Sequence, residues 1–149
     1  MRLLPLFSAL TIATASYSDC GSRFKIHAYT VDPPGIVGTG QNVTTDATFE
    51  IPQGAGLKSG RVHIHTTWNH LMATEFSAPL CEYFDCPLAN GTHTWRYRAP
   101  FPADVSGRIQ TTLRVLNDGG TSLLCFRWIA YATGTATNET SWLVRSLYA

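Results

Sequence analysis

The chain has 149 residues, a length that indicates a single domain. Only 14% of its residues are charged whereas 44% are hydrophobic, which excludes a disordered chain. Eleven Lys and Arg residues balance ten Asp and Glu residues, and without a basic block this charge argues against nucleic acid as a partner and against a polybasic membrane anchor.

The N-terminus has the three parts of a secretory signal peptide. Arg2 supplies a positive charge, residues 3–15 are mostly apolar, and small residues follow. Cleavage after Ala15 or after Ser18 fits this order of parts. We prefer Ser18, which predicts a signal peptide over residues 1–18 and a mature chain that begins at Asp19. The alternative is a buried first strand or helix.

Two other features agree with secretion. Three Asn-x-Ser/Thr sequons are candidates for glycosylation, at Asn42, Asn90 and Asn138. The chain also has four cysteines, an even number that permits three disulfide pairings in an oxidising compartment.

The spacing of the cysteines favours one of these pairings. Cys81 and Cys86 are close enough in sequence to close a small loop, and Cys20 would then join Cys125. The alternative is a zinc site, but four-cysteine zinc sites usually have two close pairs and this chain has one. Disulfides are therefore expected.

The first half of the chain alternates with the period of β-strands, and helical periodicity is almost absent. Phe24, Ile26 and Ala28 alternate with Lys25 and His27 before the run ends near residue 32. A Thr- and Val-rich strand is expected over residues 43–51, and a weaker one over residues 71–78. Between these two lies a strand with one apolar face, formed by Val62, Ile64, Thr66 and Trp68.

The second half continues the alternation. Trp95, Tyr97 and Ala99 share one face of a strand, and a later strand carries Ile109, Thr111, Leu113 and Val115 on one face. Residues 117–120 read Asn-Asp-Gly-Gly, which predicts a hairpin turn because these residues tolerate positive φ. Residues 123–131 are apolar on both faces, as in a central strand. About seven strands with frequent turns indicate an all-β protein, an antiparallel two-sheet β-sandwich.

The last residues differ in composition from the strands. Residues 133–140 are small and polar, and an apolar stretch follows at residues 142–148. We assign residues 133–149 to a C-terminal tail that docks on the sheet as an extra strand or helix. The alternative is a peptide that seeks a membrane or a partner.

The expected inner faces are rich in aromatic side chains and carry almost no charge. In a closed sandwich they form the core, which is the default. In a sandwich whose sheets splay at one edge they would line an apolar cavity. Composition does not separate the two interpretations. The aromatic residues concerned are Trp68, Phe76, Trp95, Tyr97, Phe126 and Trp128.

Several short motifs occur together in a fixed order. Asp19-Cys20-Gly21-Ser22 opens the mature chain, Cys86-Pro87 follows in the middle, and Asn117-Asp118 precedes Leu124-Cys125-Phe126. From about Asp19 to Ala132, this combination resembles the MD-2-related lipid-recognition (ML) domain family. The chain is most similar to the Niemann-Pick type C sterol carrier branch and to fungal phosphatidylglycerol/phosphatidylinositol transfer proteins. Many sterol carriers of the family have a further disulfide after the first strand, and residues 32–37 contain no cysteine here, which keeps a phospholipid open as the ligand.

The resemblance implies an immunoglobulin-like two-sheet β-sandwich over residues 19–132 with an apolar cavity between the sheets. It implies the pairings Cys20–Cys125 and Cys81–Cys86, and a cavity entrance between residues 71–76 and 101–105. The expected ligand is a sterol or a phospholipid. The residues expected to line the cavity or its entrance are Val62, Ile64, Trp68, Leu71, Phe76, Trp95, Tyr97, Phe101, Val105, Ile109, Leu113, Val115 and Phe126.

The function expected from this resemblance is that of a monomeric carrier. It would be secreted, or would work in the lumen of a lysosome or vacuole, and would move its lipid between membranes through transient contact or hand it to a membrane-protein acceptor. The first alternative is a lipid-sensing co-receptor or extracellular ligand-binding protein without transfer activity.

The second alternative is a metal-dependent enzyme. His63 and His65 lie on one strand face and His70 follows, but no carboxylate or cysteine falls at ligand spacing nearby. The sequence has no Gly-x-Ser-x-Gly elbow and no glycine-rich phosphate loop. We therefore expect no catalytic residues, no metal and no cofactor.

Overall fold

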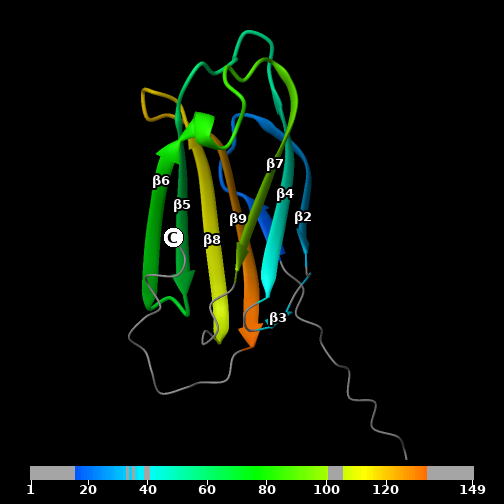
Figure 1. Ribbon diagram of the computed structural model, residues 1–149, viewed down its shortest axis with the longest axis vertical. Coiled ribbons are helices and arrows are strands. Elements are labelled where there is room, and N and C mark those ends of the chain that lie inside the picture. The colour runs from blue at the N-terminus through cyan, green and yellow to red at the C-terminus, as the bar shows by residue number, and fades with distance from the viewer. Residues whose placement is uncertain (1–15, 33, 35, 39–40, 101–105, 134–149) are drawn as a thin grey trace, which may run out of the picture.

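A computed structural model describes residues 16–32, 34, 36–38, 41–100 and 106–133, and within them the chain forms nine strands and one short 3-10 helix (Figure 1). Among these residues, no helix has both the length and the apolar character needed to cross a membrane. The elements are β1 (Ser16–Asp19), β2 (Lys25–Asp32), β3 (Ile36–Gly38), β4 (Asn42–Ile51), β5 (Arg61–Trp68), β6 (Met72–Pro79), η1 (Leu80–Glu82), β7 (Gly91–Pro100), β8 (Gly107–Leu116) and β9 (Ser122–Thr133).

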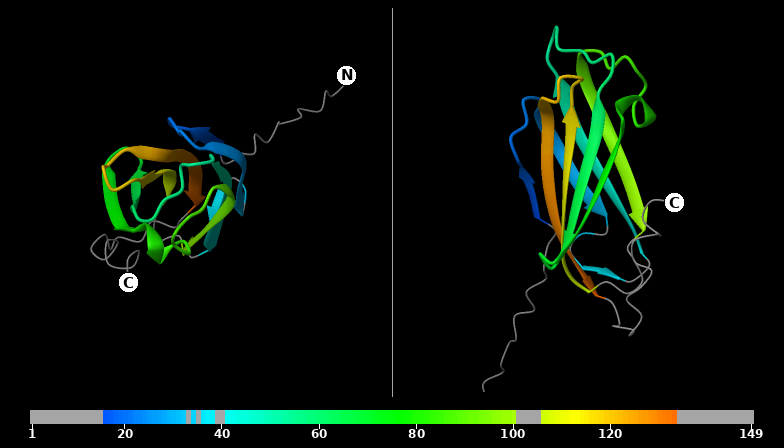
Figure 2. Two further views of the ribbon diagram at one scale, coloured as in Figure 1. Left: turned by 90° about the horizontal axis from the view of Figure 1, so that it is seen from above. Right: turned by 90° about the vertical axis from the view of Figure 1, so that its left-hand side faces the viewer.

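The strands form two sheets that face each other, as the view from above shows (Figure 2). The large sheet has the strand order β1-β9-β8-β5-β6, and β3 also pairs with β9, in parallel. The small sheet has the order β2-β4-β7. The predicted immunoglobulin-like β-sandwich is confirmed, and β9 is a central strand as its two apolar faces indicated.

The inner faces follow from the alternation of side chains along each strand. In β4, Val43, Thr45, Ala47, Phe49 and Ile51 are buried, and the residues between them are more exposed. A strand with one buried face has a fixed register, since a slip of one residue would turn every apolar side chain to solvent. Strand β4 therefore occupies the centre of the small sheet with its apolar face inward.

The structure differs from the predicted pattern in β2. A β-bulge between Ile26 and Ala28 shifts the pairing with β4 by one residue. As a result Ala28 is exposed, and Tyr29 and Val31 turn inward in its place. The prediction that Phe24, Ile26 and Ala28 share an inner face is therefore wrong for Ala28, which follows the bulge.

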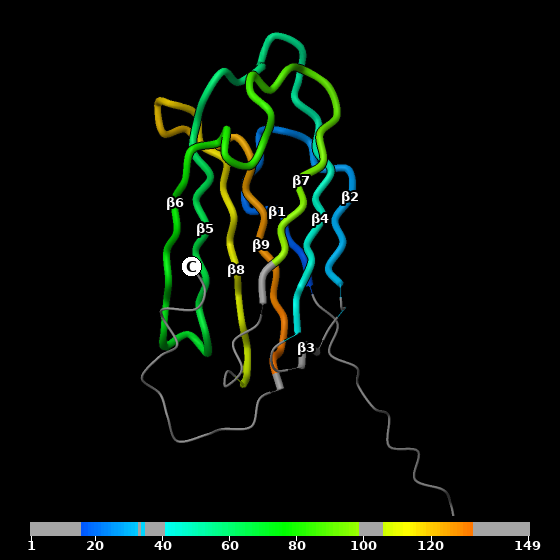
Figure 3. The backbone as a smooth tube through the Cα atoms, viewed as in Figure 1, coloured from blue at the N-terminus to red at the C-terminus, as the bar shows by residue number. Residues whose placement is uncertain are grey.

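Two strands lie where no strand was expected. Strand β1 pairs with β9, with Ser16 opposite Ile129 and Asp19 opposite Phe126 (Figure 3). Strand β3 follows the prolines of the 32–35 segment, which the sequence analysis treated only as the end of a strand. Residues 16–18 are thus part of the large sheet, although the preferred signal cleavage site after Ser18 would remove them.

The two disulfides have the predicted pairing. Cys20 and Cys125 are joined with their Cα atoms 5.1 Å apart, and Cys81 and Cys86 with theirs 5.4 Å apart. All four cysteines are used, so a zinc site at these residues is excluded. Both disulfides lie at the end of the sandwich where β6 ends and β9 begins, which we call the disulfide end.

The Asp19-Cys20-Gly21-Ser22 motif holds the first of these disulfides in place. The Asp19 carboxylate accepts hydrogen bonds from the backbone N–H groups of Gly21 (2.8 Å) and Ser22 (2.7 Å). The Ser22 hydroxyl in turn donates to the Cys125 carbonyl oxygen and accepts from the Cys125 N–H, both at 2.9 Å. Partial burial acts to raise the pKa of Asp19, but these hydrogen bonds outweigh it and the pKa is lowered.

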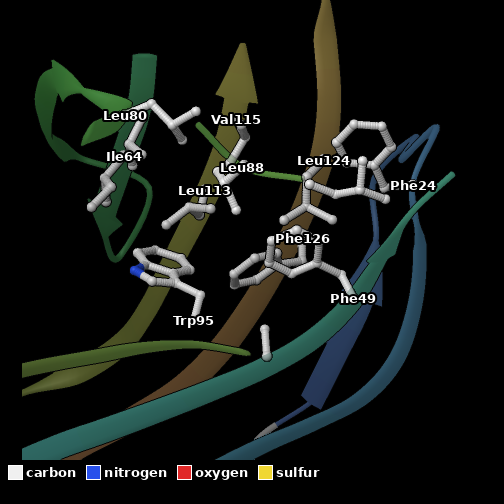
Figure 4. Packing of buried hydrophobic residues seen from close by; sticks show 13 residues of the cluster. Phe24, Phe49, Ile64, Leu80, Leu88, Trp95, Leu113, Val115, Leu124 and Phe126 are labelled. Carbon is white, nitrogen blue, oxygen red and sulfur yellow. The ribbon is translucent and has the colours of Figure 1, made fainter. Parts of the chain in front are cut away.

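The buried apolar residues form two clusters rather than one. The disulfide-end cluster fills the half of the sandwich shown in Figure 4 and comprises Phe24, Ala47, Phe49, Ile51, Val62, Ile64, Leu80, Leu88, Trp95, Leu113, Val115, Leu124 and Phe126. The hairpin-end cluster lies toward the β5–β6 hairpin and comprises Val43, Trp68, Ile109, Trp128, Ala130 and Ala132. The partly buried Tyr29 packs against both.

Candidate functional site

The structure places most of the predicted lining residues on the inner faces of the sandwich. Phe76 and Tyr97 are half-buried, at the edges of the large and small sheets. Leu71 is different, because it lies at the tip of the β5–β6 hairpin and is 88% exposed. Phe101 and Val105 lie outside the described residues. The predicted lining residues that are buried are Val62, Ile64, Trp68, Trp95, Ile109, Leu113, Val115 and Phe126.

Aromatic rings connect the two sheets across the interior. The ring centroids of Trp95 on β7 and Phe126 on β9 are 5.4 Å apart, in an edge-to-face arrangement (Figure 4). Tyr29 on β2 approaches the same Phe126 at 5.6 Å and stacks on Tyr17 of β1 at 4.2 Å. These contacts close the side of the sandwich where β1 and β2 meet.

Sequence reasoning missed both of these tyrosines. Tyr29 was hidden by the bulge in β2, and Tyr17 was assigned to the signal peptide. Burial raises the pKa of Tyr17 to about 12, with a smaller contribution from the nearby Asp19 carboxylate. Burial raises the pKa of Tyr29 as well, so both phenols stay protonated at physiological pH.

A row of threonines separates the two apolar clusters. On β5, Thr66 lies between Ile64 of the disulfide-end cluster and Trp68 of the hairpin-end cluster. Its register neighbours on the two adjacent strands are Thr74 and Thr111. On the opposite sheet Thr45 lies between Val43 and Ala47, which belong to different clusters. We call Thr45, Thr66, Thr74 and Thr111 the threonine belt.

Two threonines of the belt are only partly buried. Thr66 faces inward on a strand that has neighbours on both sides, yet it is only half-buried, and Thr74 is half-buried as well. The hydroxyls of Thr66 and Thr111 share a hydrogen bond of 3.0 Å. A completely filled core would bury the inner face of such a strand, so the partial exposure of Thr66 indicates incomplete packing beside it.

Thr74 lies on β6, at one of two unpaired sheet edges. Within the described residues, β6 ends the large sheet and β7 ends the small sheet, and no ladder joins them. Tyr83, which follows η1, bridges these edges toward the disulfide end. Its ring lies 6.4 Å from Phe76 on β6 and 6.4 Å from Trp95 on β7. Tyr83 is another interior residue that the sequence analysis missed, because it sits in the loop closed by Cys81 and Cys86 rather than on a strand.

The inner faces of strands β4 to β9 contain almost no charge. Among the described residues, their only ionisable side chain other than tyrosine is His93, which bonds the Ala89 carbonyl oxygen at 2.7 Å. The histidines considered as metal ligands, His63 and His65, lie on the outer face of β5. In the part of the chain that is described, no three His, Cys, Asp or Glu side chains are grouped so as to hold a metal ion.

Solved structures show the same architecture. A Niemann-Pick type C2 protein from the Japanese carpenter ant superposes with a TM-score of 0.61 at 11% identity, covering 79% of this chain and 99% of that one. Chicken MD-1 complexed with lipid IVa gives a TM-score of 0.56 at 13% identity, covering 78% and 88%. The C-terminal domain of wzt gives 0.54 at 10% identity, covering 85% and 87%. At such identities the likeness shows a shared fold and nothing finer.

The sequence itself identifies the family. A comparison with curated protein sequences gives no match. The family model described as the ML domain matches residues 14–132, which is most of the chain. The sandwich, the two disulfides and the superposition on two ML-domain lipid-binding proteins agree with that match. The chain therefore belongs to the ML-domain family of lipid-binding proteins.

Proposed function

We propose that this protein holds a sterol or a phospholipid between its two sheets and carries it between membranes or to a membrane-protein acceptor. The observation that supports this most directly is the half-buried Thr66 on the inner face of the large sheet. We propose that the partial exposure of this residue marks a space between the two apolar clusters, and such a space suits an apolar ligand. No covalent step is needed, and we propose that the protein is not an enzyme.

The driving force is the removal of apolar lipid surface from water. Each Å² of such surface contributes roughly 25 cal/mol on burial, so one acyl chain or sterol ring system supplies several kcal/mol. Part of this free energy is offset because the ligand loses translational and rotational freedom when it binds. A dissociation constant of about micromolar is therefore expected. The aromatic rings around Phe126 and Trp95 provide the apolar wall.

Transfer also requires contact with a membrane. Leu71 and Met72 are exposed by 88% and 52% at the tip of the β5–β6 hairpin, next to the unpaired edge of β6. Large apolar side chains at a loop tip suit shallow insertion into a lipid surface. We propose that this tip makes the transient membrane contact.

We propose a secreted protein, or one in the lumen of a lysosome or vacuole, that acts as a monomer. Two disulfides support an oxidising compartment. Asn42 and Asn90 are exposed and therefore suitable for glycosylation, and Asn138 lies outside the described residues. The sequence assignments of the signal peptide and the C-terminal tail rest mostly on residues outside the described part and remain predictions.

The test is a pair of measurements on the purified protein. Fluorescent sterol and phospholipid analogues should bind saturably at about micromolar concentration or below. Labelled lipid should then move from donor to acceptor vesicles faster with the protein than without it. The absence of saturable binding across a panel of both lipid classes would contradict the proposal.

The second candidate is a lipid-sensing co-receptor, and the similarity to MD-1, solved with lipid IVa, favours considering it. Both candidates require binding, but only a carrier requires transfer. Saturable binding with no acceleration of transfer between vesicles would support the co-receptor. Mass spectrometry of lipid that co-purifies from the native source would identify the ligand itself.

A further inference from the structure

The interior contains hydrogen-bonding groups that the protein leaves unpaired. The indole N–H groups of Trp68 and Trp95 are buried and have no hydrogen-bond partner in the protein. These residues are 7% and 3% exposed. A buried polar group without a partner costs free energy, and such groups are normally satisfied by protein or by a bound molecule.

The unpaired groups lie around the threonine belt. Trp95 belongs to the disulfide-end cluster and lies opposite Ala47, one inward position from Thr45 along β4. Trp68 belongs to the hairpin-end cluster and is the next inward residue after Thr66 on β5. The two indoles therefore border the belt from its two sides. In Figure 4 the Trp95 nitrogen points away from Phe126, toward the side where Ile64 lies.

The chemistry of these groups limits what can pair with them. An indole N–H only donates, so its partner must be an acceptor such as an oxygen atom. The described inner faces offer no cationic side chain to balance a buried anion, and His93 is engaged with the Ala89 carbonyl oxygen. An ionised carboxylate or phosphate at the belt would be heavily penalised, whereas a neutral hydroxyl, ester or ketone would not.

We infer that the ligand is a neutral amphiphile whose oxygen lies inside the sandwich at the threonine belt, where it accepts hydrogen bonds from Trp95 and Trp68. This rests on the proposed function, and it adds the ligand class and the orientation. The polar group of the lipid is held between the two apolar clusters, and its hydrocarbon packs against them. A ligand that keeps its polar group at the mouth, such as an ionised fatty acid or a phospholipid, makes no use of these donors.

The test measures four probes that share one hydrocarbon chain. Dodecane, 1-dodecanol, methyl dodecanoate and, at pH 8, dodecanoate each compete with the fluorescent apolar probe N-phenyl-1-naphthylamine. Each competition is measured on the wild type, Trp95→Phe and Trp68→Phe. Phenylalanine keeps an aromatic ring but removes the N–H, so the loss of packing affects all four probes alike.

We expect each Trp→Phe substitution to weaken the binding of dodecanol and methyl dodecanoate about five- to tenfold more than it weakens the binding of dodecane. The binding of dodecanoate should change by the same factor as that of dodecane, because the charged group of dodecanoate stays outside. Thr45→Val should show the same selectivity in weaker form. Thr112→Val is the matched control, since Thr112 is also a buried threonine but lies on the outer face of β8. It should leave all four affinities unchanged.

Two outcomes would overturn the inference, and they differ. In the first outcome, the probes bind the wild type, but the Trp→Phe substitutions weaken the binding of dodecane and dodecanol equally. The indoles then pair with water, and only this inference fails. If neither the four probes nor the fluorescent lipids bind the wild type, the proposed function fails as well. Circular dichroism and urea unfolding of each variant establish that the interior is folded before affinities are compared.

Discussion

A glycine at position 60 is required by the close approach of two strands. An added Cβ there would clash with the backbone carbonyl oxygen of Leu116. Because the obstacle is backbone, it has little room to move. Gly60→Ala should therefore destabilise the protein by about 2 kcal/mol, measured by urea unfolding.

Gly119→Ala is the control for this prediction. Gly119 lies at the tip of the β8–β9 hairpin, where a Cβ would meet only the Asn117 side chain at 3.4 Å. Its unfolding free energy should change little. Equal stability of the two variants would contradict the strict requirement for glycine at position 60.

The ion pair between Asp46 and Arg96 gives the fold a dependence on pH. The Arg96 guanidinium bonds both Asp46 oxygens, at 2.7 and 3.0 Å, across neighbouring strands of the small sheet. Hydrogen bonding to Arg96, against a small opposing effect of burial, lowers the pKa of Asp46. Because the pKa of Asp46 is lower in the folded state, the ion pair stabilises the fold at pH values above the unfolded pKa of about 3.9. This stabilisation is lost as the pH falls through the pKa of the folded state.

Asp46→Asn should therefore be less stable than the wild type at pH 7, and the difference should shrink as the pH falls below about 4. Urea unfolding over a pH series measures it. Arg96→Gln should remove the same pH-dependent part of the unfolding free energy, and the double variant should lose no more of this part than either single variant. If the losses of the two single variants add up in the double variant, the two residues do not act as a pair.

At the scale of single residues, sequence reasoning succeeded where alternation was regular. It placed Val62, Ile64 and Leu113 inside correctly because a strand period fixes the face of each side chain. It did not place Tyr29, because a bulge resets the period and leaves no mark in the sequence. It also did not find the unpaired N–H groups of the tryptophans, since pairing depends on what the opposite sheet presents.

Among the elements, the β5–β6 hairpin is held in position while its tip stays apolar and exposed. Asn69 and His70 have left-handed backbone, with φ of 48° and 61°. The Asn69 side chain accepts a hydrogen bond from the Arg108 N–H at 2.8 Å and donates one to the Ser106 carbonyl oxygen at 3.0 Å. These bonds fix the hairpin to the start of β8 and present Leu71 to solvent.

Leu71→Ser should slow transfer of lipid between vesicles several-fold and leave binding of a fluorescent lipid in solution unchanged. The reason is that Leu71 contributes to membrane contact and not to the interior. Tyr131→Ser is the control, because Tyr131 is a large side chain that is 41% exposed on the outer face of β9 and is not part of the hairpin. A loss of binding in Leu71→Ser would place Leu71 in the ligand site instead.

Strand β1 bears on the position at which the signal peptide is cleaved. Cleavage after Ser18 would remove Ser16, Tyr17 and the stacking of Tyr17 on Tyr29. Cleavage after Ala15 fits the signal pattern too and keeps the strand whole. We expect N-terminal sequencing of the secreted protein to start at Ser16, and a start at Asp19 would show that the mature sandwich lacks β1.

The sequence predicted seven of the nine strands and missed the two shortest ones. Strands β1 and β3 have four and three residues, too few to show alternation, and both add to the edge of β9. The hairpin turn at Asn117 was predicted because its Asn and Gly residues tolerate positive φ. The turn at Asn69 and His70 was not, because it contains no glycine.

For the molecule as a whole, the two disulfides should differ in their effect on stability. Cys20 and Cys125 are 105 positions apart, whereas Cys81 and Cys86 are five apart. In the chain-entropy model a loop of ~100 residues contributes about 4.7 kcal/mol and a loop of a few residues about 2 kcal/mol. Replacing the first pair with alanine should therefore lower the free energy of unfolding by roughly twice as much as replacing the second.

Urea unfolding of the two double-alanine variants measures this difference. Each variant has lost one disulfide and two thiols, so each serves as the control for the other. If replacing the Cys81–Cys86 pair lowers the free energy of unfolding more, chain entropy is not the main contribution. The packing of Tyr83 between the sheet edges is then the larger one.

The overall architecture was the most predictable property, because short motifs and strand alternation over the whole chain point to one family. The partial exposure of Thr66 was not predictable. Whether two apolar faces meet fully or stand apart depends on the sum of many side-chain volumes and on the edges that are left unpaired. The same residues would serve as core in one case and as a wall in the other.

Both covalent crosslinks lie at one end of the sandwich, and the β5–β6 hairpin lies at the other. We expect the crosslinked end to be the less mobile one, so that any motion that separates β6 from β7 grows with distance from it. A bulky guest would then enter at the far end, by a wedge-shaped widening that leaves the crosslinked end in place.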